Sequence, residues 1–358
     1  MTDFINGLAL NQSFYEEIVA PILKSHFSDL EYSAALIGWG SDVLGYDDTQ
    51  STDHNWGLRF QLFLAKQDDE KYRKLVNDAL NEQVPTEFRG YPTAFTMVVN
   101  EDQRGKAGSL KHNIDIETIG DFFSRYLGCD PYRDTEAADW LTFAEHKLLA
   151  ITSGNVFYDG LDELEPIRRK FSYYPKDVWL YMLAAQWEKI FEEAAFVGRC
   201  GYVGDELGSR IIAARQVKNM MGLCFLMERK YAPYSKWFGT AFNRLACAQE
   251  LSPIFIQVLQ AQEWTARQEF LAKGYEIVAR MHNALGVTPP LKEAAAPYYG
   301  RPYLVVADGR YVEELRKALT GAQVKNINHS LGSVNQFVDS NDQLNDLRLC
   351  KKLKELYA

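Results

Sequence analysis

The sequence has few cysteines, and neither they nor the histidines are arranged to hold a metal. Its five cysteines are widely spaced and include no CxxC pair, and its six histidines include no HxxxH or HxH pair. Structural zinc sites and zinc hydrolases rely on such pairs, so both classes are disfavoured. An odd number of scattered cysteines is also unlike a disulfide framework. We expect reduced, mostly buried thiols.

We expect neither a signal peptide at the start of the sequence nor a membrane-spanning helix. Residues 1–23 carry Asp3, Glu16 and Glu17 and have no basic start, which is unlike a signal peptide. No apolar run reaches the ~18 residues of a spanning helix. We therefore expect a cytoplasmic protein without a membrane span.

The composition is that of a folded protein with an acidic surface. Of its 358 residues, 47% are hydrophobic, 13% aromatic and 24% charged, and the formal net charge is −9. This excludes a mainly disordered chain. It also disfavours a protein that coats DNA, since a negative surface repels polyphosphate. A local basic pocket for one nucleotide is compatible with the charge.

Hydrophobic periodicity predicts a mixed α and β region first. One amphipathic helix is expected over residues 4–27, with a kink at Pro21. A strand over 54–64 follows, because Leu58, Phe60 and Leu62 alternate with polar positions. Further helices are expected over 68–81, 119–127 and 134–150, short strands over 95–99 and 113–117, and a linker over 155–175.

Beyond Pro175 the pattern becomes helical. Long helices are expected over 176–197, 205–231, 236–250 and 253–285, followed by a strand over 303–307 and a helix over 311–319. The predicted class is α+β, with a small mixed-sheet domain followed by an all-α helical bundle. The predicted division is a sheet domain at 1–165, a bundle at 166–288 and a C-terminal extension at 289–358. A ligand cleft between the first two domains is expected.

One group of residues has the composition and spacing expected of a phosphate-binding and metal-binding site. An apolar run ends in Gly40-Ser41, and after eleven intervening residues come Asp53 and Asn55, at the start of the predicted strand. A Gly-Ser turn can expose backbone N–H groups to phosphate oxygens. Residues two apart on a strand point to one face, so Asp53 and Asn55 would offer two oxygen ligands opposite the apolar stripe. Oxygen ligands of this kind suit Mg²⁺.

A third acid would complete such a site. On the predicted strand 113–117, Asp115 and Glu117 share a face. We expect a neighbouring strand to bring Asp115 beside Asp53, with Glu117 as the competing candidate.

These residues resemble the nucleotidyltransferase superfamily of the DNA polymerase β type. Its signature is a Gly-Ser turn, then Asp-x-Asp/Glu on a strand, then a third acid on a later strand. Longer stretches resemble one branch, the bacterial DUF4037 family of nucleotidyltransferase-like proteins. They are residues 40–57, 174–181, 196–199, 204–210, 228–237 and 332–340.

The resemblance implies a mechanism. Gly40 and Ser41 would hold the phosphates of an NTP, with ATP expected, and Asp53, Asn55 and Asp115 would hold Mg²⁺ or Mn²⁺. An acceptor hydroxyl would attack the α-phosphoryl group, and pyrophosphate would leave. Asn55 departs from the pattern, because the second motif position usually carries an acid. An amide brings no charge. Asn55 therefore predicts one of three things: a weaker metal site, metal binding that depends mainly on Asp115 or Glu117, or a protein of this superfamily that has lost catalytic activity.

Each of four polar residues in the helical region has two possible roles. Lys230 and Lys236 bind triphosphate or acceptor, or they interact with a helix C-terminus. Glu206 is the general base for the acceptor hydroxyl, or it stabilises a helix N-terminus. Arg210, one turn later, contacts phosphate or solvent.

Three functions stay open on the sequence. The first is transfer of a nucleoside monophosphate to a small molecule, an RNA end or a protein side chain, with the net charge favouring a small, cationic acceptor. The second is a nucleotide-binding sensor or partner protein without turnover, which Asn55 motivates. The third is a toxin that modifies tRNA or protein.

Overall fold

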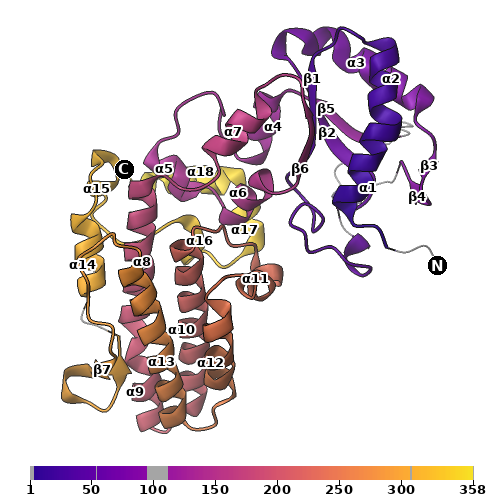
Figure 1. Ribbon diagram of the computed structural model, residues 1–358. Helices are drawn as coiled ribbons and strands as arrows, with labels where there is room; N and C mark the ends of the chain where they lie inside the picture. Colours follow the sequence, from indigo (N-terminus) through magenta and orange to yellow (C-terminus); the bar gives the residue numbers. More distant parts are fainter. Residues whose placement is uncertain (1–3, 54, 95–111, 307–308, 358) are drawn as a thin grey trace. The chain divides into compact units, whose positions relative to one another are not determined.

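Residues 4–53, 55–94, 112–306 and 309–357 are described by the computed structural model (Figure 1). Contacts divide the chain into two compact units. Unit 1 comprises residues 1–134 and 147–172, and unit 2 comprises residues 135–146 and 173–358. The chain therefore passes between the units three times. The three-part division expected from the sequence stays a prediction. The predicted α+β class is confirmed, since a mixed four-stranded sheet with helices precedes a largely helical region.

The sheet of unit 1 has the strand order β5-β2-β1-β6. β2 pairs antiparallel with β1 and parallel with β5, and β6 pairs antiparallel with β1. The strand expected over 113–117 is confirmed. The linker expected over 155–175 is wrong, because its first residues form the edge strand β6. The bounds are Tyr32–Leu36 for β1, Arg59–Leu64 for β2, Asn113–Glu117 for β5 and Asn155–Asp159 for β6.

β2 begins five residues later than the sequence predicts. Asn55 and Gly57 have φ angles of 48° and 120°, which a strand does not allow. The buried amide of Asn11 binds this stretch, donating to the Gly57 carbonyl at 2.8 Å and accepting from the Arg59 amide at 2.7 Å. The irregular backbone before β2 is thus held by side-chain hydrogen bonds instead of a strand partner.

Helices cover both faces of this sheet (Figure 1). On one face the N-terminal helices bring Phe14 and Tyr15 against Phe60, with ring centroids 6.2 and 5.9 Å apart. On the other face Phe122 of α4 (Ile119–Tyr126) packs on Phe63 at 5.6 Å. Odd-numbered residues of β2 therefore face α4, and even-numbered ones face the N-terminal helices.

The N-terminal helix is interrupted, as Pro21 predicts. α1 (Gly7–Phe14) continues into a π-helical segment, Tyr15–Val19, and then α2 (Ala20–His26). Pro21 lies in the first turn of α2 and has no N–H to donate backward. The π-helical segment widens the helix just before this position, so the chain continues after it.

The remaining predictions for unit 1 meet mixed outcomes. Helices expected over 68–81 and 119–127 are confirmed as α3 (Lys66–Gln83) and α4. The single helix expected over 134–150 is wrong, since it divides into α5 (Ala137–Thr142) and α6 (Glu145–Thr152). The strand expected over 95–99 lies outside the described residues. Three further elements are α7 (Leu164–Lys170), β3 (Glu87–Phe88) and β4 (Tyr91–Pro92).

Unit 2 is built on long helices that run side by side (Figure 1). The helix expected over 253–285 is wrong, because residues 261–263 break it into two. No helix of the described residues is both long and apolar enough to cross a membrane. The helices are α8 (Lys176–Ala194), α9 (Phe196–Tyr202), α10 (Glu206–Met227), α11 (Ser235–Phe242), α12 (Ala248–Gln260) and α13 (Trp264–Ala284).

A buried carboxyl group lies where α6 begins in unit 2. The Glu145 side chain is buried, and burial raises its pKa to about 7, offset in part by the Ala232 amide. Three mutually packed tyrosines, Tyr173, Tyr174 and Tyr231, have ring centroids 5.1–5.2 Å apart, and the Glu145 charge acts on each of them. The carboxyl group is therefore about half protonated near pH 7.

The C-terminal segment of unit 2 forms a small hairpin and short helices. β7 (Ala296–Pro297) pairs antiparallel with β8 (Leu304–Val305), inside the strand expected over 303–307. The helix expected over 311–319 is confirmed as α14. The helices of this segment are α14 (Arg310–Lys317), α15 (Ala322–Lys325), α16 (Val334–Phe337), α17 (Asn341–Asn345) and α18 (Leu347–Leu353).

Candidate functional site

The Gly-Ser turn expected from the sequence follows β1 directly. Gly38 and Gly40 have φ angles of 89° and 122°, and the Gly38 amide donates to the Ala150 carbonyl at 3.0 Å. The Tyr46 amide closes the turn on the Ser41 carbonyl at 2.9 Å. The turn is thus fixed at both ends, and glycine is needed for its positive φ angles.

Gly40 is also needed for a close approach. A Cβ at this position would lie 2.1 Å from Nη2 of Arg59, 2.2 Å from Oδ1 of Asp42 and 2.6 Å from the Asn55 carbonyl. No side chain fits at such distances. The glycine therefore lets the turn lie directly on the Arg59 side chain.

Arg59 joins the turn to the segment before β2. Its guanidinium donates to the Trp39 carbonyl at 2.8 Å, to the Asn55 carbonyl and to Oδ1 of Asp42 at 2.7 Å. Both charged side chains are buried. Burial raises the pKa of Asp42 to about 6, while Arg59 acts to lower it. Arg59 is thereby a structural clamp between the Gly40 turn and residue 55.

Ser41 lies in this turn with an unusual environment. Its hydroxyl is buried and has no hydrogen-bond partner among the described residues. The second carboxylate oxygen of Asp42, Oδ2, is likewise buried and has no hydrogen-bond partner among the described residues. Buried polar atoms without partners cost free energy and are rare. The turn therefore holds two buried polar atoms without partners among the described residues.

The structure places Asp53 and Asn55 before the strand and not on it. Asp53 ends a short 3₁₀ helix, Ser51–Asp53, and its side chain lies outside the described part of the chain. The exposed Asn55 has a left-handed backbone, and its carbonyl binds Arg59. The alternation argument that put Asp53 and Asn55 on one strand face is wrong. Asparagine is among the residues that tolerate a left-handed backbone.

Asp115 lies where the sequence predicts, on a strand adjacent to β2. The register pairs it with Gln61, so its side chain projects from the face that carries Arg59 and α4. Asp115 keeps exposed surface, yet nearby protein desolvates it and raises its pKa, while Arg125 and then Arg59 lower it. An acid is thus available on the same side of the sheet as the Gly40 turn.

Glu117, the competing third acid, is already engaged. It is largely buried, and its Oε1 accepts from Nη2 of Arg125 at 2.6 Å. Among the described side chains, no group of three or more His, Cys, Asp or Glu residues could hold a metal. Asp115 is therefore the more available acid, and a metal held there would need a ligand such as Asp53.

Aromatic and cationic side chains of unit 1 adjoin this acid. The Arg125 guanidinium lies 5.2 Å from the centroid of the Trp39 ring, and the Tyr126 ring packs edge-on against Trp39 at 4.5 Å. The buried Lys147 lies 5.7 Å from the Tyr126 centroid. The half-exposed Trp39 indole and Arg125 give the turn an aromatic and cationic edge.

Glu206 and Arg210 lie at the start of α10, in unit 2. Glu206 accepts from Arg267 at 2.9 Å and from the Trp264 amide at 3.1 Å. Arg267 is only 1% exposed and also donates to Ser209 at 2.6 Å. Arg210 donates to the carbonyl and side chain of Gln262. These contacts fasten the start of α10 to the start of α13.

Lys230 and Lys236 follow the other end of α10. The 22-residue helix separates Lys230 from Glu206 by about 30 Å along its axis. Lys236 places its ammonium 4.9 Å from the centroid of the Trp237 ring, and both lysines are exposed. The structure therefore does not bring Glu206 and Arg210 together with the two lysines.

Sequence reasoning missed Asp42, Arg59, Arg125 and Trp39. Arg59 interrupts an apolar strand at an odd position, and Asp42 directly follows the Gly-Ser pair. These were the available signals, but a buried ion pair between them requires knowledge of how the turn folds back on β2. The Arg125–Trp39 contact depends on the packing of α4, which no local pattern encodes.

Comparison with known proteins matches part of this chain to a family. Residues 140–238 match the model of the family described as a domain of unknown function, DUF4037. No curated protein matches. Among solved structures, the chain is similar to a nucleotidyltransferase-like protein from Exiguobacterium sibiricum 255-15. That likeness has 9% identity and a TM-score of 0.33, covering 78% of this chain and 76% of the other. Residues 140–238 of this chain are thus similar to the DUF4037 family.

Proposed function

We propose that this protein is a Mg²⁺-dependent nucleotidyltransferase that moves a nucleoside monophosphate from an NTP to an acceptor hydroxyl. One observation carries the proposal. β5 pairs parallel with β2 in a register that puts Asp115 beside Gln61, on the face where Arg59 holds the Gly40–Ser41 turn. A carboxylate and a glycine-serine turn thus share one side of one sheet.

The turn is suited to the phosphates. Gly40 allows the backbone to approach closely, and the Ser41 hydroxyl has no partner among the described residues. Successive N–H groups of such a turn bind anionic oxygens. In the proposal this turn holds the β and γ phosphates, and the half-exposed Arg125, which lies against the Trp39 ring, stands at its edge.

The available donors are oxygens, which fit a hard divalent cation. Asp115 and Asp53 would hold Mg²⁺ or Mn²⁺, and the neutral Asn55 would contribute at most an amide oxygen. When bound, the cation would offset negative charge on the phosphates. The turn and Asp115 would orient the NTP so that its α-phosphorus faces the acceptor.

The reaction balances without an added oxidant or reductant. The acceptor oxygen forms a bond to the α-phosphorus, the bond from that phosphorus to the bridging oxygen of pyrophosphate breaks, and the hydroxyl proton passes to a base. Glu206 is left out of this proposal because Arg267 and the Trp264 amide already hold its carboxylate. Arg210 and the lysines Lys230 and Lys236 are left unassigned.

A second candidate, nucleotide binding without transfer, is favoured by Asn55. This residue has a left-handed backbone and supplies the carbonyl that Arg59 clamps. Its position is explained by turn geometry, with no need for an acid at residue 55. A protein that keeps the turn and Asp115 but lacks the second acid would bind an NTP and release it unchanged.

The test combines binding and turnover on the full chain. Calorimetric titration with each of the four NTPs plus Mg²⁺ measures binding. Release of labelled pyrophosphate is followed with γ-labelled NTP and three acceptor pools: small metabolites, total RNA and total protein. Nucleotidyl transfer predicts Mg²⁺-dependent binding and a product tagged from α-labelled NTP. Binding without product in every pool would support the second candidate, and absence of NTP binding would contradict both.

A further inference from the structure

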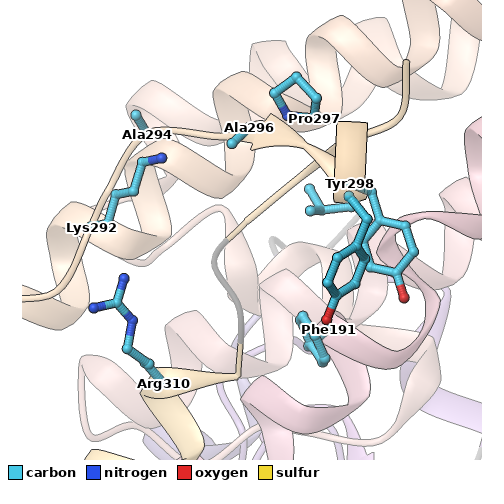
Figure 2. A pocket seen from close by; sticks show the side chains of 9 residues that line it. Phe191, Lys292, Ala294, Ala296, Pro297, Tyr298 and Arg310 are labelled. Atoms are coloured by element: carbon cyan, nitrogen blue, oxygen red, sulfur yellow. The ribbon is translucent and has the colours of Figure 1, made fainter. Parts of the chain in front are cut away.

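Unit 2 contains two features that the proposed transfer reaction does not use. One is a pocket of about 260 Å³ between α8 and the segment around the β7–β8 hairpin (Figure 2). The other is a pair of cysteines, Cys224 on α10 and Cys247 directly before α12. No cysteine is among the described residues that line the pocket, so the cysteine pair is a separate place in the fold. This pair offers two thiols that an oxidant can join.

Glu228 brings the two cysteines to one place. It lies one helical turn after Cys224, and its amide donates to the Cys224 carbonyl at 2.9 Å. Its carboxylate accepts from the Cys247 amide at 2.8 Å and from the Ala246 amide at 2.9 Å. Residues one turn apart lie on the same face of a helix, so Cys224 and Glu228 share the side of α10 that meets the start of α12.

Aromatic packing fixes the spacing of these helices. Phe225, next to Cys224, packs against Phe238 and Phe242 of α11, with ring centroids 5.3 and 6.4 Å apart. Phe242 in turn packs on Phe255 of α12 at 5.7 Å, and both of these rings are buried. Moving the two cysteines apart would therefore disrupt an apolar core that spans three helices.

The two thiols contact each other but differ in access. The Cys247 thiol is a hydrogen-bond partner of the Cys224 thiol, and neither cysteine is in a disulfide. Cys224 is fully buried, whereas Cys247 is half-buried. Burial raises the pKa of the Cys224 thiol well above its usual range, and the Cys247 thiol and the Glu228 charge raise it further. Because the thiolate is the reactive form, an oxidant reaches Cys247 first.

The other cysteines lie on different elements. Cys200 is half-buried on α9, and its thiol has Asp205 as a hydrogen-bond partner. Cys350 is buried on α18 and donates to the Leu344 carbonyl at 3.7 Å. Cys129 belongs to unit 1. Cys224 and Cys247 therefore form a defined pair, and Cys200 offers a control of similar burial.

We infer that Cys224 and Cys247 form a reversible disulfide when the protein meets a peroxide. The Cys247 thiolate attacks one oxygen of hydrogen peroxide, the O–O bond breaks, and the products are a sulfenic acid and, after protonation of the released hydroxide, water. The Cys224 sulfur then displaces the sulfenic hydroxyl group, the S–S bond forms, and the Cys224 proton leaves with that hydroxyl as a second water. Two thiols are thus oxidised by two electrons, and one peroxide is reduced.

The disulfide has a direct structural consequence. Residues 225–246, which include Lys230 and Lys236, would lie inside a covalently closed loop. Closing a loop restricts the unfolded chain and so stabilises the folded one. Oxidation would therefore fasten the end of α10 to the start of α12. The inference goes beyond the proposed transfer reaction and uses none of its residues.

Peptide mapping of the full chain tests the linkage. The protein is treated with hydrogen peroxide, its remaining thiols are alkylated, and it is digested with trypsin. Cys224 and Cys247 fall in separate tryptic peptides, residues 219–229 and 245–267, each with one cysteine. The two peptides should be linked after peroxide and separate after dithiothreitol. The melting temperature should rise by several degrees on oxidation and return on reduction.

Single variants test the order of reaction. In Cys224→Ser the sulfenic acid at Cys247 has no thiol partner, so dimedone should label it. In Cys247→Ser the buried Cys224 should stay a thiol under the same treatment. Cys200→Ser removes a half-buried thiol on α9 and should leave the linkage and the shift in melting temperature unchanged. Circular dichroism checks that each variant folds.

The inference is overturned by any of three results. The first is the absence of dimedone label at Cys247 in Cys224→Ser. The second is the absence of linked peptides in the unaltered protein under conditions that label Cys247 in that variant. The third is a peroxide-induced disulfide that joins Cys247 to a cysteine other than Cys224.

Discussion

Nη2 of Arg59 lies 2.7 Å from Oδ1 of Asp42, and the two side chains are 9% and 0% exposed. Breaking a buried pair by removing one partner leaves an uncompensated charge in the core. Arg59→Met should therefore lower the free energy of unfolding by about 3–5 kcal/mol. Urea unfolding followed by circular dichroism measures the change.

An exposed pair in the same unit provides the control for Arg59→Met. Lys74 pairs with Asp78 on α3, and its side chain is 83% exposed. Lys74→Met should cost less than about 1 kcal/mol, because water already solvates both partners. Equal losses of unfolding free energy in Arg59→Met and Lys74→Met would show that the buried Arg59–Asp42 pair stabilises the protein no more than an exposed pair does.

Substitutions of two glycines distinguish the cost of a steric clash from the cost of a positive φ angle. Gly40→Ala places a methyl group 2.1 Å from Arg59 and should unseat the turn, with loss of stability and of NTP binding. Gly45→Ala has open space around its Cβ but keeps a φ of 67°, so it should cost only about 1 kcal/mol of backbone strain. Thermal unfolding and NTP titration compare them. NTP affinity that is intact in Gly40→Ala would contradict the proposed phosphate turn.

Asp115→Asn tests the proposed acid. It preserves shape and removes the charge, so Mg²⁺-dependent nucleotide turnover should fall at least about 100-fold while the melting temperature stays close to that of the unaltered protein. Asp121→Asn on the neighbouring α4 is the matched control, because its side chain is 62% exposed and pairs only at 3.3 Å with Arg73. Similar losses of turnover in both variants would remove Asp115 from the site.

Glu206 can be tested as a structural residue. Glu206→Ala removes the carboxylate partner of Arg267, a guanidinium that is 1% exposed and keeps its other hydrogen bonds, and should cost about 1–3 kcal/mol of stability. NTP binding should be unchanged. The exposed Glu269→Ala on α13 should change neither. Loss of turnover in Glu206→Ala at unchanged stability would instead restore Glu206 as the general base.

Glu145 predicts a pH dependence of stability. Burial raises its pKa to about 7 in the folded chain, above its unfolded value near 4.5. Between these values the folded state holds the proton and the unfolded state does not, so this group lowers stability as pH rises. Glu145→Gln should therefore gain stability over the unaltered protein from pH 5 to pH 8, reaching about 3 kcal/mol.

The measurement for Glu145→Gln is urea unfolding at several pH values. His282 acts in the opposite direction, because burial lowers its pKa to about 4 and stability then falls as pH decreases below its unfolded value near 6.5. The comparison uses the difference between variant and unaltered protein, in which His282 cancels. A difference that does not change with pH would contradict a raised pKa at Glu145.

Local patterns predicted the sheet where they were strong and failed where tertiary contacts decide. The alternation of apolar and polar residues predicted β2 and β5 because one face of each strand is apolar. β6 was missed because Val156 and Phe157 stand between Gly154 and Gly160, which resembles a loop, and pairing with β1 makes it a strand. The start of β2 was misplaced because hydrogen bonds from Asn11 hold the preceding residues in an irregular path.

The candidate site was predictable in part for the same reason. The Gly40–Ser41 turn and the acid at Asp115 follow from residue type and order. The partners of these residues do not, because Arg59, Arg125 and Trp39 approach them from separate elements. Glu206 shows the reverse case, in which a plausible acid at a helix start is explained by Arg267, more than fifty residues later.

The threefold passage of the chain between the units has a consequence for ancestry and for dissection of the gene. Cutting after residue 172 would leave residues 135–146 attached to the wrong partner, and the DUF4037 match at 140–238 crosses two of the three junctions. Neither unit can be exchanged by recombination at a single joint. A fragment that keeps each unit whole therefore cannot be made with a single cut.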